Sequence, residues 1–203
     1  MNELKRNRKS LIILLLLAIA VIAAGIYEFS GLPRKMETET GSGYRRFATG
    51  TLAAFLVKAD RPLVPDLSFK DAQGSDIKIS KWRGRVVLLN LWATWCAPCR
   101  KEMPTLADLQ EQLGSKDFEV VALSVDRKGI EASSTFLKET GADSLGLYVD
   151  ETNKSLDDLQ ALGLPVTVLI DRKGREIGRL LGPAEWNSPQ AIALIKAAVA
   201  ESP

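Results

Sequence analysis

The chain has 203 residues, of which 46% are hydrophobic and 26% are charged, a balance that favours one folded domain with accessory segments over a disordered chain. Residues 1–29 hold four basic and two acidic residues, which accounts for the net charge of +2, and the remainder holds 23 of each sign. Because no basic excess remains outside the N-terminus, the composition disfavours nucleic-acid binding.

The N-terminus predicts a membrane anchor. Residues 11–27 read "LIILLLLAIAVIAAGIY", are uncharged, and follow a basic cluster at residues 5–9. We expect a cytoplasmic tail at 1–10 and a transmembrane anchor at 11–29, with the globular part on the far side. A cleaved signal peptide is the alternative, with "AIA" at 18–20 as its cleavage site, but the apolar run continues through residues 21–24. Such a chain suits the inner membrane of a bacterium, with its domain in the periplasm.

The next segment, residues 30–62, is predicted to be a linker. It begins "SGLPRKMETETGSGYRR", which is polar and rich in glycine, so it cannot bury enough apolar surface to fold alone. Residues 47–58 predict a short helix that packs on the domain, interrupted at Gly50. The folded domain is expected to span residues 63–203.

Within this domain, strand and helix patterns alternate. A hairpin is predicted around Gln73 and Gly74, and buried strands at 85–92, 118–126 and 164–171, with a short strand at 145–150 and a hairpin partner at 175–181. Helices are predicted after the cysteine pair, closed by Gly114, then at 131–139, from a cap at Asn153 to about 162, and from a cap at Ser188 with Pro189 in the first turn. This order predicts an α/β fold with a mixed central sheet and helices on both faces.

The two cysteines of the chain, Cys96 and Cys99, lie three positions apart in "LNLWATWCAPCRKEMP". A structural staple is disfavoured, because so short a loop gains little from closure. A dedicated metal site is disfavoured too, because two thiols without any histidine leave a zinc or copper shell half empty, although transient Cu(I) binding by two thiolates stays open. A redox-active disulfide needs no cofactor and explains the placement.

The redox interpretation follows from the strand and helix around the pair. Cys96 ends a predicted strand and begins a predicted helix, where free N–H groups and the helix dipole favour a thiolate. Cys99 is one turn further along the same face, placed to attack a mixed disulfide formed at Cys96. The intervening Ala97 and Pro98 are uncharged, so the disulfide is relatively favoured and the dithiol is predicted to be a reductant, nearer about −270 mV than about −120 mV.

These residues resemble the thioredoxin superfamily, and within it the membrane-anchored periplasmic TlpA/ResA/CcmG-like thiol-disulfide reductases. The resemblance covers residue 63 to about residue 200 and is carried by "WATWCAPCRKEMP", "DFEVVAL" and "GPAEW". It looks closest to the TlpA branch of rhizobia and related α-proteobacteria. It implies a thioredoxin-like fold with an N-terminal hairpin and a central β-α insertion at about residues 129–162.

The resemblance also implies roles for individual residues. Cys96 matches the attacking cysteine and Cys99 the resolving one. Glu102 matches an acidic residue that assists proton transfer from the resolving thiol, with a solvated helix-face glutamate as the alternative. Asn90 departs from the pattern, because thioredoxins carry a buried aspartate there; an amide takes no proton, so that role passes to Glu102 or water.

A second group of residues is implied to contact substrate. Trp95 matches a tryptophan that flanks the active site and is expected to be partly exposed, whereas Trp92 is expected in the core. Pro165 matches the cis-proline that faces the cysteine pair, and its cis bond turns the backbone of Leu164 outward so that a substrate strand can pair with it.

We therefore expect a membrane-anchored, periplasm-facing thiol-disulfide oxidoreductase that acts as a reductant and a monomer. The resemblance implies that it reduces copper-binding cysteines of Sco-type chaperones and of oxidase subunit II, and that a membrane donor of the CcdA/DsbD type recharges it. Reduction of apocytochrome c thiols and a non-catalytic Cu(I) carrier are the alternatives. A peroxidase of the same fold is disfavoured, because it needs a lone cysteine in a Thr-x-x-Cys setting.

Overall fold

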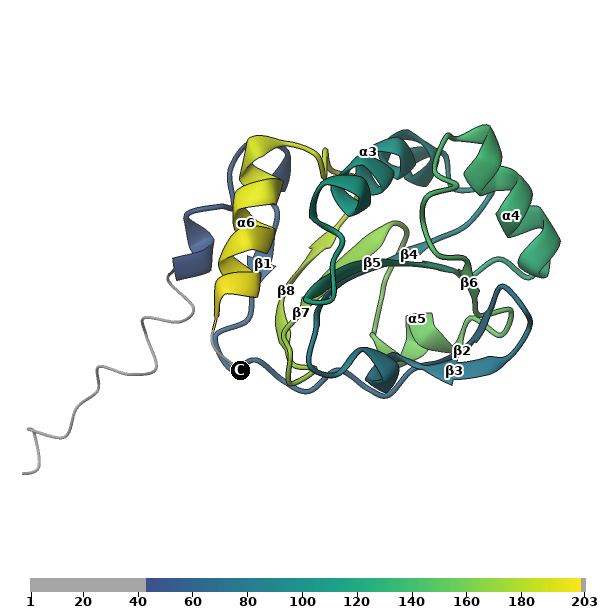
Figure 1. Cartoon of the computed structure of the whole chain (residues 1–203), viewed down its shortest axis with the longest axis horizontal. Helices are drawn as coiled ribbons and strands as arrows, with labels where there is room; N and C mark the ends of the chain where they lie inside the picture. Colours follow the sequence, from purple (N-terminus) through teal and green to yellow (C-terminus); the bar gives the residue numbers. More distant parts are fainter. Residues whose placement is uncertain (1–42, 202–203) are drawn as a thin grey trace, which may run out of the picture. The chain divides into compact units, whose positions relative to one another are not determined.

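The computed structural model describes residues 43–201, which form an eight-stranded mixed sheet with helices on both sides (Figure 1). The strands are β1 (Leu56–Val57), β2 (Ser68–Asp71), β3 (Asp76–Lys78), β4 (Val86–Trp92), β5 (Phe118–Ser124), β6 (Tyr148–Val149), β7 (Val166–Ile170) and β8 (Glu176–Leu181). Their order across the sheet is β1-β8-β7-β4-β5-β6-β2-β3. This arrangement confirms the predicted α/β class and thioredoxin-like fold.

The centre of the sheet is the most deeply buried part of the described chain. Every residue of β4 is buried, and β4 pairs in parallel with β5 and antiparallel with β7. A strand covered on both faces needs no alternation of polar and apolar residues, which is why "VVLLNLW" is almost continuously apolar. The exception is Asn90, which is fully buried and belongs to the site described below.

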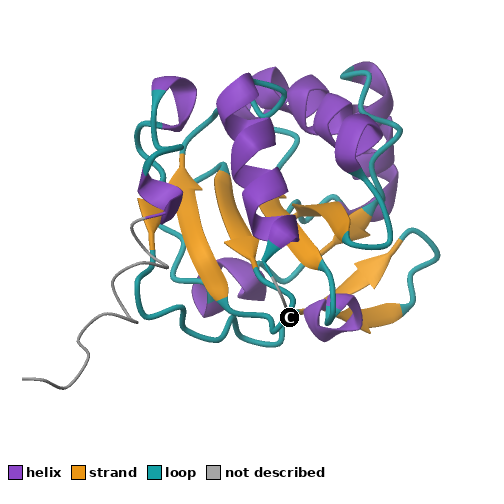
Figure 2. Cartoon of the chain, turned by 60° about the vertical axis from the view of Figure 1, so that its left-hand side comes forward, coloured by secondary structure: helices purple, strands orange, loops and turns teal. Residues whose placement is uncertain are grey.

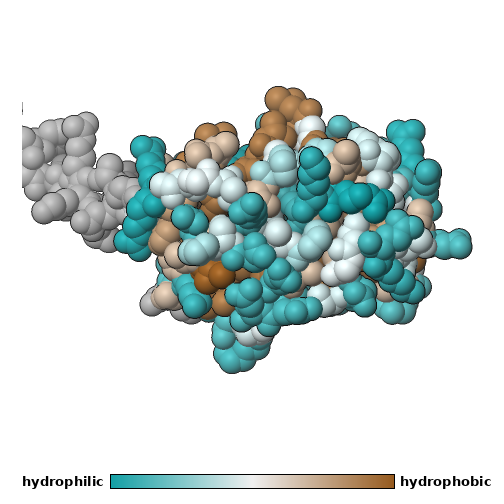
Figure 3. Space-filling view, turned by 90° about the horizontal axis from the view of Figure 1, so that it is seen from above, coloured by the Kyte–Doolittle hydropathy of each residue, from teal (hydrophilic) through white to brown (hydrophobic). Residues whose placement is uncertain are grey.

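The helices cover both faces of this sheet. They are α3 (Ala97–Leu113), α4 (Gly129–Glu139), α5 (Lys154–Asp158) and α6 (Pro189–Ala200), with 3-10 turns η1 (Gly50–Leu52) and η2 (Ile79–Trp82). Figure 1 shows α3 and α4 on one side of the sheet and α5 on the other, and Figure 2 shows the orange strands enclosed by helices. Seen from the side of α3 and α4, much of the surface is hydrophilic, as expected for amphipathic helices (Figure 3).

Two predicted hairpins are present and share one turn chemistry. Between β2 and β3, the Asp71 carboxylate accepts hydrogen bonds from the N–H groups of Gln73 and Ser75, both at 3.0 Å. Between β7 and β8, Asp171 accepts from the N–H groups of Lys173 and Arg175, both at 2.9 Å. In each turn a glycine takes the left-handed conformation, which a residue with a Cβ adopts only at a cost.

The last predicted helix is confirmed, and the preceding one is shorter than predicted. Ser188 caps α6 by accepting a hydrogen bond from Ala191 N–H, as the sequence indicated. By contrast, α5 ends at Asp158, well before residue 162, and the side chain of Asn153 makes no cap bond. Asp150, three residues upstream, supplies the acceptor to Ser155 N–H at 2.7 Å, so the predicted role of Asn153 was wrong.

The predicted boundary between linker and domain at residue 62 was also wrong. Tyr44, Leu52 and Phe55 are buried in the core, and β1 pairs with β8. The predicted helix at 47–58 is instead η1 followed by β1. Residues 52–57 read "LAAFLV" and are all apolar, but they follow a polar, glycine-containing stretch, so the average composition of residues 30–62 concealed them.

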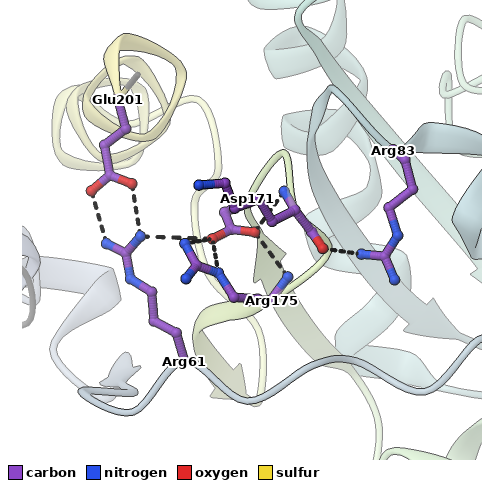
Figure 4. Close-up of polar contacts among 6 residues, drawn as sticks. Arg61, Arg83, Asp171, Arg175 and Glu201 are labelled. Atoms are coloured by element: carbon purple, nitrogen blue, oxygen red, sulfur yellow. Dashed lines mark hydrogen bonds and ion pairs between the residues drawn. The ribbon is translucent and has the colours of Figure 1, made fainter. Parts of the chain in front are cut away.

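An ion-pair cluster fixes the end of this N-terminal segment. The Arg61 guanidinium bonds both carboxylate oxygens of Glu201 at 2.8 Å and lies 3.8 Å from Asp171 (Figure 4). The side chain of Arg175 donates to the same oxygen of Asp171, Oδ2, at 2.8 Å. Residues 43–62 are therefore held against both the last helix and the β7–β8 turn.

The predicted tail at 1–10, the predicted anchor at 11–29 and the first part of the predicted linker lie outside the described residues. Within residues 43–201, no helix is long and apolar enough to cross a bilayer.

Candidate active site

The two cysteines lie where β4 ends and α3 begins, and they are joined by a disulfide. Cys96 is the N-cap residue of the 17-residue helix α3, and its sulfur accepts a hydrogen bond from Cys99 N–H at 3.2 Å. Cys96 is 4% exposed and Cys99 is fully buried. An N–H donor and the positive end of a long helix both favour negative charge on Cys96, so once reduced, Cys96 is the thiol suited to attack.

The turn that leads into the cysteine pair is fixed by an aspartate that the sequence analysis did not single out. Asp126, just after β5, accepts hydrogen bonds from both the N–H and the hydroxyl of Thr94, and a third from Lys128 N–H at 2.9 Å. Burial alone would raise the pKa of Asp126, but these donors hold it below its ordinary value. The carboxylate therefore anchors the backbone two residues before Cys96. Asp126 lies 32 residues after Thr94 in the sequence, so no local pattern indicates the contact between them.

The two tryptophans of the motif have different environments, as predicted. Trp92 is fully buried and its ring stacks on Phe136 of α4, with 4.7 Å between ring centroids. Trp95, directly before Cys96, is 69% exposed. A large aromatic side chain left in solvent beside a reactive disulfide is available to contact another molecule.

The predicted cis-proline is present and its loop lies at the same end of the sheet as the cysteine turn. The Leu164–Pro165 peptide bond is cis, and Val166, the next residue, pairs with Leu91 of β4. Pro165 is buried and its carbonyl accepts a hydrogen bond from Gly182 N–H at 2.8 Å. Among residues 43–201, no hydrogen bond engages the backbone N–H or C=O of Leu164. That backbone is thus free to pair with an incoming strand.

Glu102, the third candidate catalytic residue, is 2% exposed, so it is not a solvated helix-face glutamate. Its Oε1 accepts a hydrogen bond from Asn90 Nδ2 at 2.8 Å, and its Oε2 accepts from Ala184 N–H at 3.1 Å and from Trp186 Nε1 at 3.2 Å. Burial raises the pKa of Glu102 from 4.5 to about 7, although the three donors oppose that rise. Glu102 lies one turn after Cys99 on α3, and a carboxyl group with this pKa can exchange a proton near neutral pH.

The donors around Glu102 come from parts of the chain far apart in sequence. Asn90 belongs to β4, whereas Ala184 and Trp186 belong to the segment between β8 and α6, more than 80 residues beyond Glu102. Asn90 is fully buried, and its Oδ1 has no hydrogen-bond partner among the described residues. No pattern in the sequence indicated Ala184 or Trp186 as partners of Glu102. Within residues 43–201, no group of three or more cysteine, aspartate or glutamate side chains is placed to hold a metal ion.

This fold and site define a thioredoxin-like thiol-disulfide oxidoreductase, and the chain belongs to the Redoxin family, whose family model matches residues 58–195. The chain is 31% identical over 118 residues to the thiol-disulfide oxidoreductase ResA of Bacillus anthracis, covering 58% of this chain and 67% of that protein. It is 33% identical over 118 residues to ResA of Bacillus subtilis strain 168, covering 58% and 65%.

A solved structure is similar as well. The crystal structure of a DsbE-type thiol:disulfide interchange protein from Chlorobium tepidum matches with a TM-score of 0.61 and 30% identity, covering 68% of this chain and 96% of that one. The chain is therefore a thiol-disulfide oxidoreductase of the ResA/DsbE type, with Cys96 and Cys99 as its cysteine pair.

Proposed function

We propose that this chain is a membrane-anchored, periplasm-facing reductant of protein disulfides, with the copper-binding dithiols of Sco-type chaperones and of oxidase subunit II as its clients. The observation that carries the proposal is the Cys96–Cys99 pair at the start of α3, with exposed Trp95 beside it and a buried carboxyl group one turn further on.

The reaction begins with the reduced pair. The Cys96 thiolate attacks one sulfur of the client disulfide, forming a mixed disulfide and releasing the other client sulfur as a thiolate, which takes a proton from solvent. Cys99 then gives its thiol proton to Glu102 and attacks the Cys96 sulfur. The Cys96–Cys99 disulfide forms, the second client sulfur leaves as a thiolate, and two electrons have passed to the client.

The client is held by groups around the pair. Trp95 offers an apolar surface, and the free backbone of Leu164, before cis-Pro165, offers a donor and an acceptor to an extended client segment. Such pairing uses backbone hydrogen bonds and not side-chain contacts. It therefore orients the client disulfide while placing few requirements on the client sequence.

The direction of electron flow follows from the residues between the cysteines. Ala97 and Pro98 carry no charge, so within residues 43–201 the Cys96 thiolate is stabilised by the helix N-terminus and the Cys99 N–H group. A modestly stabilised thiolate leaves the disulfide relatively favoured, and the dithiol therefore gives its electrons away.

A reductant in an oxidising compartment must be recharged. We propose that residues 11–29 hold the chain in the inner membrane as a single span, with the basic cluster at residues 5–9 on the cytoplasmic side. A membrane electron donor of the CcdA/DsbD type would then reduce the Cys96–Cys99 disulfide, and the chain would act as a monomer.

The client assignment is tested by trapping. Full-length Cys99→Ser chain, reduced and incubated in membranes, should accumulate mixed disulfides at Cys96, because the resolving thiol is gone. The Cys96→Ser/Cys99→Ser double variant is the matched control and should trap nothing. Recovery of Sco-type chaperones or oxidase subunit II supports the proposal, whereas recovery of apocytochrome c alone overturns it.

A further inference from the structure

The carboxyl group of Glu102 has two oxygens with chemically different partners. Oε2 accepts from Ala184 N–H and from the indole N–H of Trp186, and Oε1 accepts from the side-chain amide of Asn90. A backbone N–H and an indole N–H can only donate hydrogen bonds. Oε2 must therefore remain an acceptor whether Glu102 is charged or neutral, and a proton on Glu102 must sit on Oε1, facing Asn90.

As described, Asn90 is oriented for the charged form of Glu102. Its Nδ2 donates one hydrogen to Glu102 Oε1 at 2.8 Å and the other to Thr167 Oγ1 at 2.9 Å. Its Oδ1 is buried and has no hydrogen-bond partner among the described residues. If Oε1 carried a proton while Nδ2 kept this place, two hydrogens would point at each other and a buried polar contact would be lost.

A half turn of the Asn90 amide removes the clash between the two hydrogens, and it moves the NH2 group to the buried position where Oδ1 has no partner among the described residues. Oδ1 would then take the place of Nδ2 and accept hydrogen bonds from both neighbours. Glu102 would donate its new O–H, and Thr167 would donate its hydroxyl, because a hydroxyl can both donate and accept. Asn90 is thus the one partner of the Glu102 carboxyl group, among those described, that can both donate to it and accept from it.

We propose that Asn90 is a positioning residue whose side-chain amide turns when Glu102 gains or loses its proton, donating to the carboxylate and accepting from the carboxylic acid. This inference rests on the proposed function, in which Glu102 takes the thiol proton of Cys99. The proton arrives at Oε1, and Oδ1 of the turned amide accepts a hydrogen bond from the new O–H group. When Glu102 releases the proton to solvent, the amide turns back.

The described side chains that bond the Glu102 carboxyl group are neutral, and the charged residues near it in sequence point to solvent. The pKa of Glu102 near 7 means that both protonation states are populated at neutral pH. Arg100 and Lys101 on α3, and Glu185 between the two Oε2 donors, are exposed. Within residues 43–201 no ion pair includes Glu102, and β4 and β7 contribute only Asn90 and Thr167 to this hydrogen-bond network. The disulfide-bonded Cys96 and Cys99 do not titrate.

The amide rotation can be observed directly in the unaltered sequence. The full-length oxidised chain in detergent, labelled with ¹³C at glutamate carboxyls and ¹⁵N at asparagine side chains, would be titrated by NMR from pH 5 to pH 9. We expect the Asn90 side-chain amide signals to change with the same midpoint as the Glu102 carboxyl carbon. In Glu102→Gln the amide should stop responding. Asn90 signals that stay constant while Glu102 titrates overturn the proposal.

Two variants separate a turning amide from a fixed donor. Trp186→Phe removes a donor that bonds the carboxylate more strongly than the neutral acid, because a hydrogen bond to a charged acceptor is the stronger one, so the pKa of Glu102 should rise by about one pH unit. Asn90→Leu removes a group that donates to the carboxylate and, once turned, accepts from the acid, so both forms lose a hydrogen bond and the pKa should rise clearly less. An equal rise in both variants means that Asn90 is a fixed donor and overturns the proposal.

The same titration distinguishes this inference from the proposed function. The rate at which Cys99 resolves a preformed mixed disulfide at Cys96 would be measured over the same pH range. If that rate does not change at the pH where Glu102 titrates, while the Asn90 signals do, the amide turns but Glu102 does not take the thiol proton. If the rate follows the midpoint and the Asn90 signals do not, the proposed function stands and the turning amide is wrong.

Discussion

Replacing Glu102 by glutamine should stabilise the oxidised protein at pH 8 and leave it about as stable at pH 5. The folded protein raises the pKa of Glu102 from 4.5 to about 7, mainly because the group is buried. Between these values the folded state keeps a proton that the unfolded chain has lost, so the free energy of unfolding falls as pH rises from about 4.5 to about 7. At about 1.4 kcal/mol per pH unit, the loss comes to about 3 kcal/mol above pH 7.

Glutamine resembles the protonated form of Glu102 and has no such loss. The measurement is urea unfolding of the full-length oxidised chain in detergent at pH 5 and pH 8, followed by tryptophan fluorescence. Glu111→Gln makes the same chemical change at an exposed position of α3 and should leave the difference between the two pH values as it is in the parent chain. If Glu102→Gln also leaves that difference unchanged, Glu102 is not a buried acid with a raised pKa.

Two further substitutions test packing and capping. In Gly178→Ala, the new Cβ would lie 2.6 Å from both the Leu56 carbonyl oxygen and the Phe55 ring. We expect β1 to separate from β8, with a loss of about 1–3 kcal/mol in the free energy of unfolding. Residues 43–62 should then become sensitive to limited proteolysis. Gly163→Ala, where a Cβ meets nothing within 4 Å, is the control, and equal proteolysis of both variants would refute the packing of β1. Ser188→Ala removes the cap of α6 and should cost about 1 kcal/mol by urea unfolding, while Ser115→Ala, outside the helices, should cost less.

Local sequence signals were sufficient for most of the fold. The apolar run that became β4, the Asp-to-Gly turns and the Ser188-Pro189 start of α6 each depend on neighbours within a few residues, so their patterns could be interpreted without the tertiary structure. The position of Cys96 at a helix start is a signal of the same local kind.

The remaining features depend on contacts between distant segments. Asn90, Glu102, Thr167 and Trp186 form one hydrogen-bond network, yet no spacing in the sequence indicates that they meet. The burial of Tyr44 and Phe55 likewise exists only because β8 and α6 lie where this segment passes. The cap at the start of α5 was misassigned because Asp150, and not Asn153, supplies the acceptor to Ser155 N–H.

The central claim is that the Cys96–Cys99 dithiol gives electrons to its clients. The most direct test is the reduction potential of this pair in the full-length chain, measured by equilibration with glutathione or dithiothreitol redox buffers. We expect a value close to that of thioredoxin, about −270 mV. A value near about −120 mV, typical of a strong oxidant, would contradict it.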